Sequence, residues 1–473
     1  MERIDRREFC TGAAGLAGII AAGCGPSLYA AGANEKIRVA CVGYSDRFHQ
    51  TLLPCFLHHS KELGFDMVAV ADLWKKRLDE HAKPAIEKAI GHEVEAFGSD
   101  IALYEAKKRL GLDAVIISTA DFQHAQHAVH AAEAGCDAYC EKPIAEDMYS
   151  ANLLLDAVNA KRAGGAMNPG SVLQVGSQRR SGRRYMAARD FIRSGKFGDI
   201  SSVNLTWNVN QPRRWRRDEE LVASLKKEDV DWNLWLLDRD PKENPFDPRK
   251  YLEFRLFWPF SSGIPGQWMC HQIDTVAWFM GQPYPKSAVA SGGLYQWADG
   301  RQSYDTFATL MEYGESGVKG GGFQVMFQSR QTNCAGGTDP HHESPVEKYF
   351  GPNGCIDLGS GCVTNEGVER AKPTSEKLPA PSETVVTSAN TGGDPLTSAH
   401  MRNWMECVRA RTNPNAPVEA GYSHSVALIM SNAALRTGLR ATFDGETRQV
   451  LAGGKPWTGY ASVADGNFFT KIF

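Results

Sequence analysis

The chain has 473 residues, and its 52 Lys and Arg against 55 Asp and Glu give a formal net charge of −3 at pH 7. Hydrophobic residues make up 42% of it and charged residues 23%, a globular composition that excludes disorder over most of the chain. Nucleic acids and anionic membranes attract basic surfaces, so we expect neither as a partner of this near-neutral chain. The length predicts two or three domains.

The cysteines and histidines do not form a recognisable metal motif. The 11 cysteines are scattered without a CxxC pair, so the sequence predicts neither a zinc site nor a disulfide framework. Cys136 and Cys140 lie in an apolar stretch and are interpreted as buried thiols. His124, His127 and His130 recur every three residues, but no carboxylate is placed among them. We therefore expect core or solvated histidines and no metal.

Residues 1–33 are interpreted as an export signal. An uncharged run over residues 9–34 is rich in glycine and alanine, which is too weakly apolar to favour a membrane span. Residues 5–9, Asp-Arg-Arg-Glu-Phe, resemble a twin-arginine signal, and Ala-Gly-Ala at residues 31–33 is a small-residue cleavage site. We expect recognition by the twin-arginine export machinery and a periplasmic or exported location. Lipid anchoring at Cys24 and a disordered tail are weaker alternatives.

A short apolar run at residues 36–43, Lys-Ile-Arg-Val-Ala-Cys-Val-Gly, predicts a buried parallel strand that ends in a glycine turn. Such a turn can bring backbone N–H groups and a helix N-terminus up to a pyrophosphate. The turn reads Gly43-Tyr44-Ser45-Asp46-Arg47-Phe48, with serine and phenylalanine where the G-x-G-x-x-G motif has its second and third glycines. The motif alone is weak, and any strand-to-helix turn would explain it as well.

Asp72 follows a second predicted strand at residues 67–71. An acidic residue at this place can accept hydrogen bonds from the ribose hydroxyls of an adenosine, and it repels a 2′-phosphate, which favours NAD over NADP. Asp72 lies 29 residues after Gly43, so an insertion around residues 58–65 is expected beyond the usual spacing of about 20. The neighbouring cations blur the preference: Lys75, Lys76 and Arg77.

Strand and helix patterns alternate up to Lys142. A helix is predicted from Ser99 or Asp100 to Arg109, and the later elements are a strand at 113–119, a helix at 124–134 and a strand at 136–141. This alternation predicts an α/β fold with a doubly wound parallel sheet.

Several motifs resemble the glucose–fructose oxidoreductase/inositol dehydrogenase family (Gfo/Idh/MocA). They run from Thr119-Ala-Asp-Phe-Gln-His124 and Glu141-Lys142-Pro143 to His271-Gln-Ile-Asp274, with further matches at residues 133–135, 174–179, 193–195, 198–200, 261–263, 350–354, 400–411, 417–419 and 422–436. The resemblance covers nearly all of residues 36–445. The pairing of E-K-P with H-x-x-D is its most specific part.

The resemblance implies a Rossmann domain over residues 34–168 and a substrate-binding α/β domain over residues 169–473, with an open, largely antiparallel sheet. Alternating runs at 202–208 and 306–313 have strand period. Residues 213–255 are expected to form a surface segment, with residues 213–217 as a solvated or subunit-contact face. Residues 320–345 are expected to be a loop, and the protein is expected to be a homo-oligomer.

The resemblance also implies NAD as the cofactor, with NADP less favoured, and places the E-K-P lysine beside the nicotinamide and the substrate hydroxyl. The residues expected to bind the cofactor come from the glycine turn, the strand ends and the segment after residue 174: Gly43, Tyr44, Ser45, Asp46, Arg47, Asp72, Thr119, His124, Glu141, Lys142 and Gln178.

Oxidation of an alcohol removes a hydride, which the cofactor takes, and a proton, which the protein takes. His271 is the candidate base, Lys142 can stabilise the developing alkoxide, and Asp274 can orient the site. Relatives often carry an aspartate four or five residues before the histidine, whereas this chain has Gln267 and Gly266. Glutamine cannot take a proton, which puts the usual carboxylate–histidine pairing in doubt.

The sequence therefore favours an exported NAD-dependent oxidoreductase that acts on a CH–OH group of a small-molecule carbohydrate or polyol. Because the twin-arginine route exports folded proteins, the cofactor is expected to be held tightly and recycled in place. Paired oxidation and reduction of two sugars would satisfy this, as would an NAD-dependent, redox-neutral glycoside hydrolase. A non-catalytic sugar-binding homologue is the alternative from another class.

Overall fold

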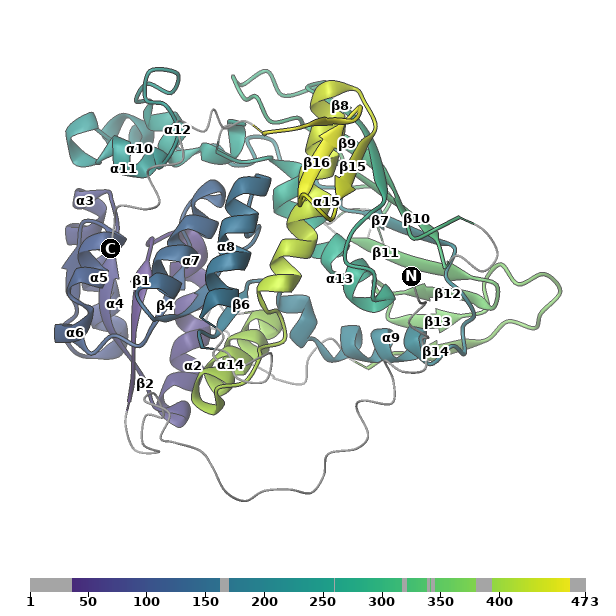
Figure 1. Ribbon diagram of the computed structural model, residues 1–473, viewed down its shortest axis with the longest axis horizontal. Coiled ribbons are helices and arrows are strands. Elements are labelled where there is room, and N and C mark those ends of the chain that lie inside the picture. Colours follow the sequence, from purple (N-terminus) through teal and green to yellow (C-terminus); the bar gives the residue numbers. More distant parts are fainter. Residues whose placement is uncertain are drawn as a thin grey trace. The chain divides into compact units, whose positions relative to one another are not determined.

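The structure is a computed structural model that describes residues 36–161, 170–258, 260–316, 321–337, 341, 345–379 and 394–459. The predicted signal at residues 1–33, Cys24 within it and the predicted domain boundary at residue 168 lie outside these ranges. The described residues form one unit that contains two sheets with helices packed on them (Figure 1). No helix in the described ranges combines the length and apolar character needed to cross a membrane.

The first sheet is parallel and six-stranded, with the order β3-β2-β1-β4-β5-β6 of a doubly wound dinucleotide-binding fold. Its strands are β1 (Ile37–Val42), β2 (Phe65–Ala71), β3 (Glu95–Phe97), β4 (Ala114–Ile117), β5 (Asp137–Cys140) and β6 (Leu173–Val175). The Rossmann prediction is confirmed. The central strands β1 and β4 are buried and almost entirely apolar because helices cover both faces, and Cys136 and Cys140 are buried free thiols as expected.

The helices of the first sheet are α2 (Leu53–Leu63), α3 (Lys75–Arg77), α4 (Lys83–Ile90), α5 (Asp100–Glu105), α6 (Lys107–Leu110), α7 (His124–Glu133) and α8 (Met148–Ala160). A π-helical turn at Phe48–Leu52 runs into α2, and this long helix occupies the expected insertion before β2. Late in the chain, α14 (Pro395–Ala410) returns to pack beside α2 (Figure 1). Strand β6 lies after residue 168, the predicted domain boundary, and still pairs with β5 of the first sheet.

His400 ties α14 to the end of β6. Its Nε2 lies 2.8 Å from the carbonyl oxygen of Val175 and its Nδ1 2.6 Å from Ser181 Oγ, and the ring is buried. Burial lowers the pKa of His400 from 6.5 to about 4.

We expect this histidine to make the fold acid-sensitive. The unfolded chain binds the proton first, so the free energy of unfolding should fall as the pH drops from about 6.5 towards 4, by up to roughly 3 kcal/mol for this group. Denaturant titrations at several pH values should show a smaller pH dependence for His400→Gln than for the wild type. The exposed His92, whose pKa is raised by Glu93 and Asp66, provides the control His92→Gln. An unchanged pH slope in His400→Gln would contradict the assignment.

The second sheet is eleven-stranded, with the order β14-β13-β12-β11-β7-β10-β9-β8-β15-β16-β17. Its strands are β7 (Ser202–Thr206), β8 (Ser287–Gly293), β9 (Thr306–Tyr313), β10 (Phe323–Arg330), β11 (Val346–Gly351), β12 (Gly354–Asp357), β13 (Cys362–Thr364), β14 (Ser375–Lys377), β15 (Ala441–Asp444), β16 (Gln449–Ala452) and β17 (Lys455–Pro456). Only β7 and β10 pair parallel among these strands, which confirms the predicted antiparallel character. The loop expected at residues 320–345 is wrong where β10 stands, because alternate side chains there are buried.

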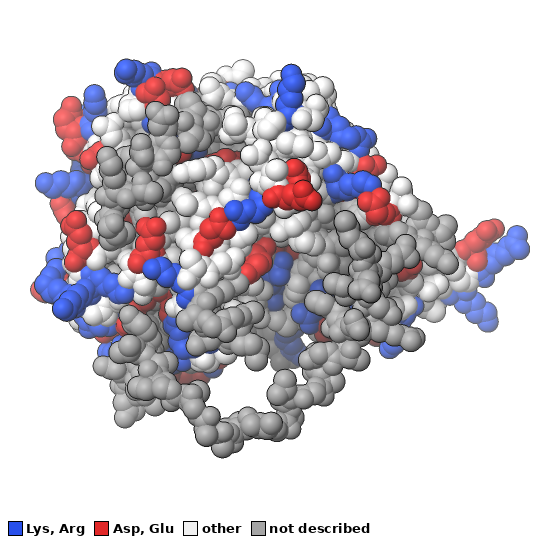
Figure 2. Space-filling view, viewed as in Figure 1, with Lys and Arg blue, Asp and Glu red and all other residues white. Residues whose placement is uncertain are grey.

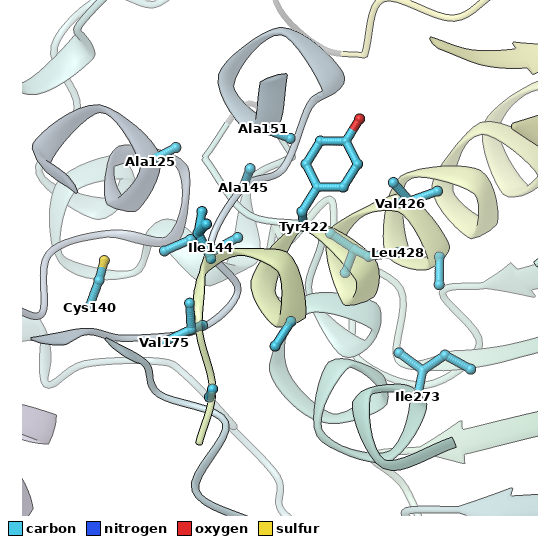
Figure 3. Packing of buried hydrophobic residues seen from close by; sticks show 14 of the residues in the cluster. Ala125, Cys140, Ile144, Ala145, Ala151, Val175, Ile273, Tyr422, Val426 and Leu428 are labelled. Atoms are coloured by element: carbon cyan, nitrogen blue, oxygen red, sulfur yellow. The ribbon is translucent and has the colours of Figure 1, made fainter. Parts of the chain in front are cut away.

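The remaining helices are α9 (Arg183–Arg193), α10 (Glu219–Ser224), α11 (Trp232–Leu236), α12 (Pro248–Leu252), α13 (Cys270–Met280) and α15 (Val418–Thr437). Helix α15 contacts β8 and α13, and also α8 and β6 of the first sheet. Figure 3 shows Ile144 and Val175 facing the start of α15. A Cβ on Gly421 would lie 2.9 Å from a methyl group of each, so only glycine allows this approach. The E-K-P segment is thereby packed against the second sheet's main helix.

Acidic and basic side chains of the described residues are interspersed on the face shown in Figure 2. Ion pairs such as Arg448–Asp156 and Arg402–Glu62, both at 2.7 Å, join opposite charges at the protein surface. Exposed pairs of this kind contribute little to stability, about 0–1 kcal/mol each.

Candidate functional site

Two adjoining cavities lie at the carboxyl ends of the parallel strands, where doubly wound sheets bind ligands. The large cavity, about 770 Å³, follows the ends of β1 and β2, and the small cavity, about 310 Å³, lies between the ends of β4 and β5 and the residues that lead into α13. The two share part of their walls: Ser45, Arg47, Ser118, Thr119 and Arg255.

The glycine turn after β1 forms one wall of the large cavity. Gly43 has φ +84°, and a Cβ there would lie 2.6 Å from Thr119 Cγ2, so the turn requires glycine despite its incomplete motif. Asp72, directly after β2, accepts hydrogen bonds from the backbone N–H groups of Tyr44 and Trp74, both at 2.9 Å. The structure thus places Gly43 and Asp72 together, as the sequence predicts.

The other predicted turn residues also line the large cavity. Asp46 pairs with Arg217 at 2.6 Å and with Arg77 at 3.7 Å, and the Arg77 guanidinium lies 5.7 Å from the ring centre of Tyr44. Ser45 Oγ bonds Ser118 Oγ at 3.1 Å, which joins the turn to the end of β4. The cation Arg77 stands near the Asp72 end of the cavity, so it can moderate the preference against a 2′-phosphate.

The histidines of α7 are buried, so the expected alternative of core histidines is confirmed, but their surroundings differ from the expectation in one respect. Asp100 supplies the carboxylate that seemed to be missing: its Oδ2 lies 2.8 Å from His127 Nδ1 and 2.7 Å from His130 Nδ1, and all three residues are buried. Burial opposes ionisation, but the two histidines outweigh it and lower the pKa of Asp100. The sequence did not reveal this partner because Asp100 lies 27 residues before His127, and α5 and α7 come into contact only in the folded chain. The trio closes one end of the large cavity through Asp100 and His127.

Lys142 and His271 meet on the wall of the small cavity, as predicted. Lys142 Nζ donates to the carbonyl oxygen of Gln267 at 2.9 Å and lies 3.5 Å from that of Gly266. His271, in the first turn of α13, packs with its ring 5.7 Å from that of Trp207. Burial, then the charges of Lys142 and Arg179, holds the pKa of His271 well below its usual range. The imidazole is neutral at physiological pH and can accept a proton.

Glu141 and His124 support the segment that carries Lys142. Glu141 accepts from Arg47 Nε at 2.9 Å, and this pairing overcomes burial and lowers the pKa of Glu141. The ring nitrogens of His124 lie 2.8 Å from the Pro143 carbonyl oxygen and 3.2 Å from that of Thr119. Both predicted residues line the small cavity, but His124 acts there by linking the ends of β4 and β5.

Two buried polar atoms on the small cavity wall fit a nicotinamide. Thr119 Oγ1 and Gln178 Oε1 have no hydrogen-bond partner within the described residues. A buried polar atom without a partner is costly, and the carboxamide and ribose hydroxyls of a nicotinamide nucleotide supply suitable donors. With the glycine turn and Asp72 at the adenosine end, the residues present match a dinucleotide cofactor.

Asp274 is placed differently from the prediction. Its carboxylate is buried, accepts two close bonds from Arg180 at 2.8 and 3.0 Å, and lies 3.8 Å from His424 Nδ1. Burial opposes its ionisation, but Arg180 and His424 lower the pKa of Asp274. Asp274 is absent from the lining of the cavity that His271 faces, because its carboxylate points to Arg180 and His424 inside the protein. This placement fits a structural role and does not support the predicted catalytic one.

The small cavity includes residues that the sequence analysis did not select: Trp207, Arg214, Arg255, Gln267 and Trp268. Trp268 precedes His271 by three residues, so helical spacing could have found it. The interpretation of residues 213–217 as a solvated or subunit-contact face is wrong for three of its arginines. Arg214 lines the small cavity, Arg217 lines the large one, and Arg216 pairs with the buried Glu253 at 3.0 Å. Only the tertiary structure brings this segment over the strand ends.

The absence of an aspartate at position 266 has a steric reason. A Cβ on Gly266 would lie 2.6 Å from Ser262 Oγ and 2.8 Å from Glu146 Oε1, and these two atoms are hydrogen-bonded to each other. Burial and then the charge of Asp121 raise the pKa of Glu146 to about 8. Gln267 bridges Arg255, at 2.8 Å, and Asp121, at 2.5 Å. The carboxyl groups of Asp121 and Glu146 therefore lie outside the lining of the small cavity.

Gly266→Ala is expected to destabilise the fold by about 1–3 kcal/mol, the usual cost of overpacking a buried site. Because the carbonyl groups of residues 266 and 267 position Lys142, NAD-coupled turnover should fall as well. Denaturant unfolding and initial rates measure the two effects. Gly445→Ala is the control, since a Cβ there meets nothing within 4 Å. Wild-type stability and rate in Gly266→Ala would contradict the packing argument.

Residues 37–165 match the family model described as "Oxidoreductase family, NAD-binding Rossmann fold" (GFO_IDH_MocA). An inositol 2-dehydrogenase of Rhizobium meliloti (strain 1021) is 32% identical over 141 residues, which are 30% of this chain and 37% of that protein. Inositol 2-dehydrogenase 3 of Saccharopolyspora erythraea is 25% identical over 176 residues, 37% of this chain and 47% of that protein. The chain therefore matches less than half the length of these relatives.

Solved structures share the fold over most of the chain. An oxidoreductase domain protein from Kribbella flavida has a TM-score of 0.60 at 15% identity, covering 86% of this chain and 98% of its own. An aldose-aldose oxidoreductase from Caulobacter crescentus, complexed with glycerol, has a TM-score of 0.58 at 14% identity, covering 86% and 100%. The similarity to the Gfo/Idh/MocA oxidoreductase family is thus shown for the NAD-binding Rossmann domain at residues 37–165.

Proposed function

We propose that this protein is an exported NAD-dependent oxidoreductase that acts on a CH–OH group of a carbohydrate or polyol and holds its cofactor tightly. One observation carries the proposal: Lys142 and the neutral His271 share a small cavity that adjoins the cavity built from the glycine turn and Asp72. Alcohol oxidation needs a base that accepts the hydroxyl proton and a cofactor that accepts the hydride, and a nearby cation stabilises the developing alkoxide. The two cavities bring residues for these three roles together.

The side chains divide the chemistry between them. A nicotinamide bound beside Thr119 and Gln178 would supply the hydride acceptor for the alcohol carbon. His271 accepts the hydroxyl proton, because its lowered pKa keeps the imidazole neutral. Lys142, oriented by the Gln267 carbonyl, donates to the substrate oxygen and stabilises its developing negative charge. Trp207 and Trp268 on the same wall help to exclude water.

Turnover with a panel of sugars and polyols tests the proposal, with reduced nicotinamide followed by absorbance. Accumulation of NADH with a single sugar supports dehydrogenation. If an oxidised sugar forms only when a second sugar is present to be reduced, the result supports paired oxidation and reduction. Glycoside cleavage with no net NADH supports the redox-neutral hydrolase. This alternative is considered because the carboxylates of Asp121 and Glu146 are hydrogen-bonded outside the small cavity, so none of the usual kind stands beside His271. Sugar binding without any turnover would support the alternative of a non-catalytic sugar-binding homologue.

Export and tight cofactor retention are supported by the resemblance of residues 5–9 to a twin-arginine signal. A compartment without a soluble NAD pool would favour a cofactor that is carried out with the folded chain. Cell fractionation measures the location, and assay of the supernatant after denaturation measures nicotinamide per chain. Cytoplasmic retention of the full chain would overturn export, and a chain purified without nicotinamide would overturn tight retention.

The homo-oligomer is supported by an exposed apolar strip on the second sheet. Leu310 on β9 and Met326 on β10 stand opposite each other and are 36% and 50% exposed. Neighbouring apolar side chains on an open sheet face favour association. Light scattering of the purified chain checks the oligomeric state, and Met326→Lys should weaken it if this face is used.

A further inference from the structure

The wall of the small cavity carries more positive than negative side chains. Arg47, Lys142, Arg214 and Arg255 line it, and Glu141 is the only carboxylate among its described lining residues. Arg47 already engages Glu141 at 2.9 Å. We infer that the substrate carries a carboxylate, as an acidic sugar does, and that Arg214 and Arg255 bind this group. The inference rests on the proposed oxidoreductase function and specifies its substrate class.

Arg214 is held in place by its own segment. The residues on either side, Arg213 and Trp215, have φ of 64° and 68°, a left-handed conformation that is costly for side chains of this size. The carbonyl oxygen of Arg214 accepts from Arg301 Nη2 at 3.1 Å, and the Arg214 side chain donates to Gln211. These contacts hold the backbone in its strained conformation. Backbone strain maintained in this way is typical of ligand-binding sites.

An aromatic surface adjoins the Arg214 guanidinium. The rings of Trp207 and Trp268 are stacked, with centres 6.2 Å apart and planes 16° apart, and Trp215 packs 5.6 Å from Trp268. The Arg214 guanidinium lies 5.4 Å from the Trp268 ring centre. An apolar C–H face of a sugar ring fits against such a surface while a carboxylate on that ring reaches the guanidinium.

Arg255 adds a second cation at the border of the two cavities. Its Nε donates to the neutral Gln267 side chain at 2.8 Å, and its nearest carboxylate, Asp121, is 3.9 Å away and itself bonded to Ser261 and Gln267. This ion pair is long, so a substrate carboxylate can compete for the guanidinium. Arginine suits the role because its planar fork binds carboxylates with two parallel hydrogen bonds.

Charge balance favours an acid over a neutral polyol. His271 is uncharged, so the carboxylate of Glu141, paired with Arg47, stands against the cations Lys142, Arg214 and Arg255 among the described lining residues, and an oxidised nicotinamide would add another positive charge. Cations removed from water are stabilised by a paired anion. A neutral substrate would supply no such anion, whereas a carboxylate would.

Binding and turnover with matched pairs of sugars test the inference. D-glucuronate is compared with D-glucose, and D-galacturonate with D-galactose, by tryptophan fluorescence of the NAD-loaded protein and by initial rates. The acids should bind and react at least roughly 10-fold better than their neutral partners. Arg214→Gln and Arg255→Gln should each lower this preference by roughly 10- to 100-fold, the effect of one charge-assisted hydrogen bond. Arg213→Gln is the matched control, because the exposed Arg213 does not line the cavity.

The two proposals fail in different ways. Acids that bind with the expected preference but are not oxidised would overturn the proposed reaction and support the carboxylate site. Neutral sugars that bind and react as well as the acids would overturn the carboxylate site and support the reaction. An acid preference that survives in both arginine variants would also overturn the assignment of these two residues.

Discussion

Lys142→Ala and His271→Ala are each expected to abolish NAD-coupled turnover while leaving NAD binding nearly unchanged. The reason is a division of labour between the cavities: the glycine turn and Asp72 belong to the large cavity, whereas these two side chains line only the small one. Loss of proton transfer removes 10²- to 10⁴-fold in rate, roughly 3–5 kcal/mol of barrier.

Initial rates and NAD titrations of both variants measure this separation. Lys161→Ala and His92→Ala, at residues exposed on the surface, are the matched controls. The lowered pKa of His271 adds a pH signature: the wild type should lose activity only at a pH below the usual histidine range, as the imidazole becomes protonated. A His271→Ala protein with the wild-type rate would rule out His271 as the base.

Asp72→Ala is expected to weaken NAD binding and to relax the preference against NADP. The carboxylate stands at the end of β2 on the large cavity, where it can accept the ribose hydroxyls and repel a 2′-phosphate. It also holds the backbone N–H groups of Tyr44 and Trp74 at 2.9 Å, so its loss loosens the glycine turn. Charge-assisted hydrogen bonds of this kind contribute roughly 1.5–3 kcal/mol each, which predicts at least a 10-fold rise in Kd.

Calorimetric titration with NAD and NADP separates the two roles of this residue. Asp72→Asn keeps one acceptor oxygen but removes the charge, so it should relax the NADP preference more than it weakens NAD. Asp79→Ala, at an exposed aspartate nearby, is the control. An NAD affinity equal to the wild type in Asp72→Ala would show that this carboxylate does not bind the cofactor.

The sequence by itself was sufficient for the elements whose pattern is local. The buried parallel strands β1, β2, β4 and β5 are mostly apolar runs, with charged residues only at Arg38, Asp66 and Asp137, and their alternation with helices determines a doubly wound sheet. Strands β3 and β6, with three residues each, are too short to show a period, and β3 is mostly exposed. The parallel order that places them at the edges arises from long-range pairing.

For the site, the sequence identified the residues that stand directly at strand ends or in the motif of α13. Gly43, Asp72, Thr119, Lys142 and His271 all line the two cavities, because the carboxyl ends of parallel strands meet at one edge. Such residues can be assigned from chain position alone.

Only the tertiary structure decided which charges face the cavities. Asp274 and His271 are three residues apart, yet the carboxylate pairs with Arg180 inside the protein. Arg214 comes from a segment with no periodic pattern and reaches the cavity through a left-handed backbone between Arg213 and Trp215. These placements depend on contacts between residues far apart in the chain, such as Arg301 with Arg214, and local sequence patterns do not record them.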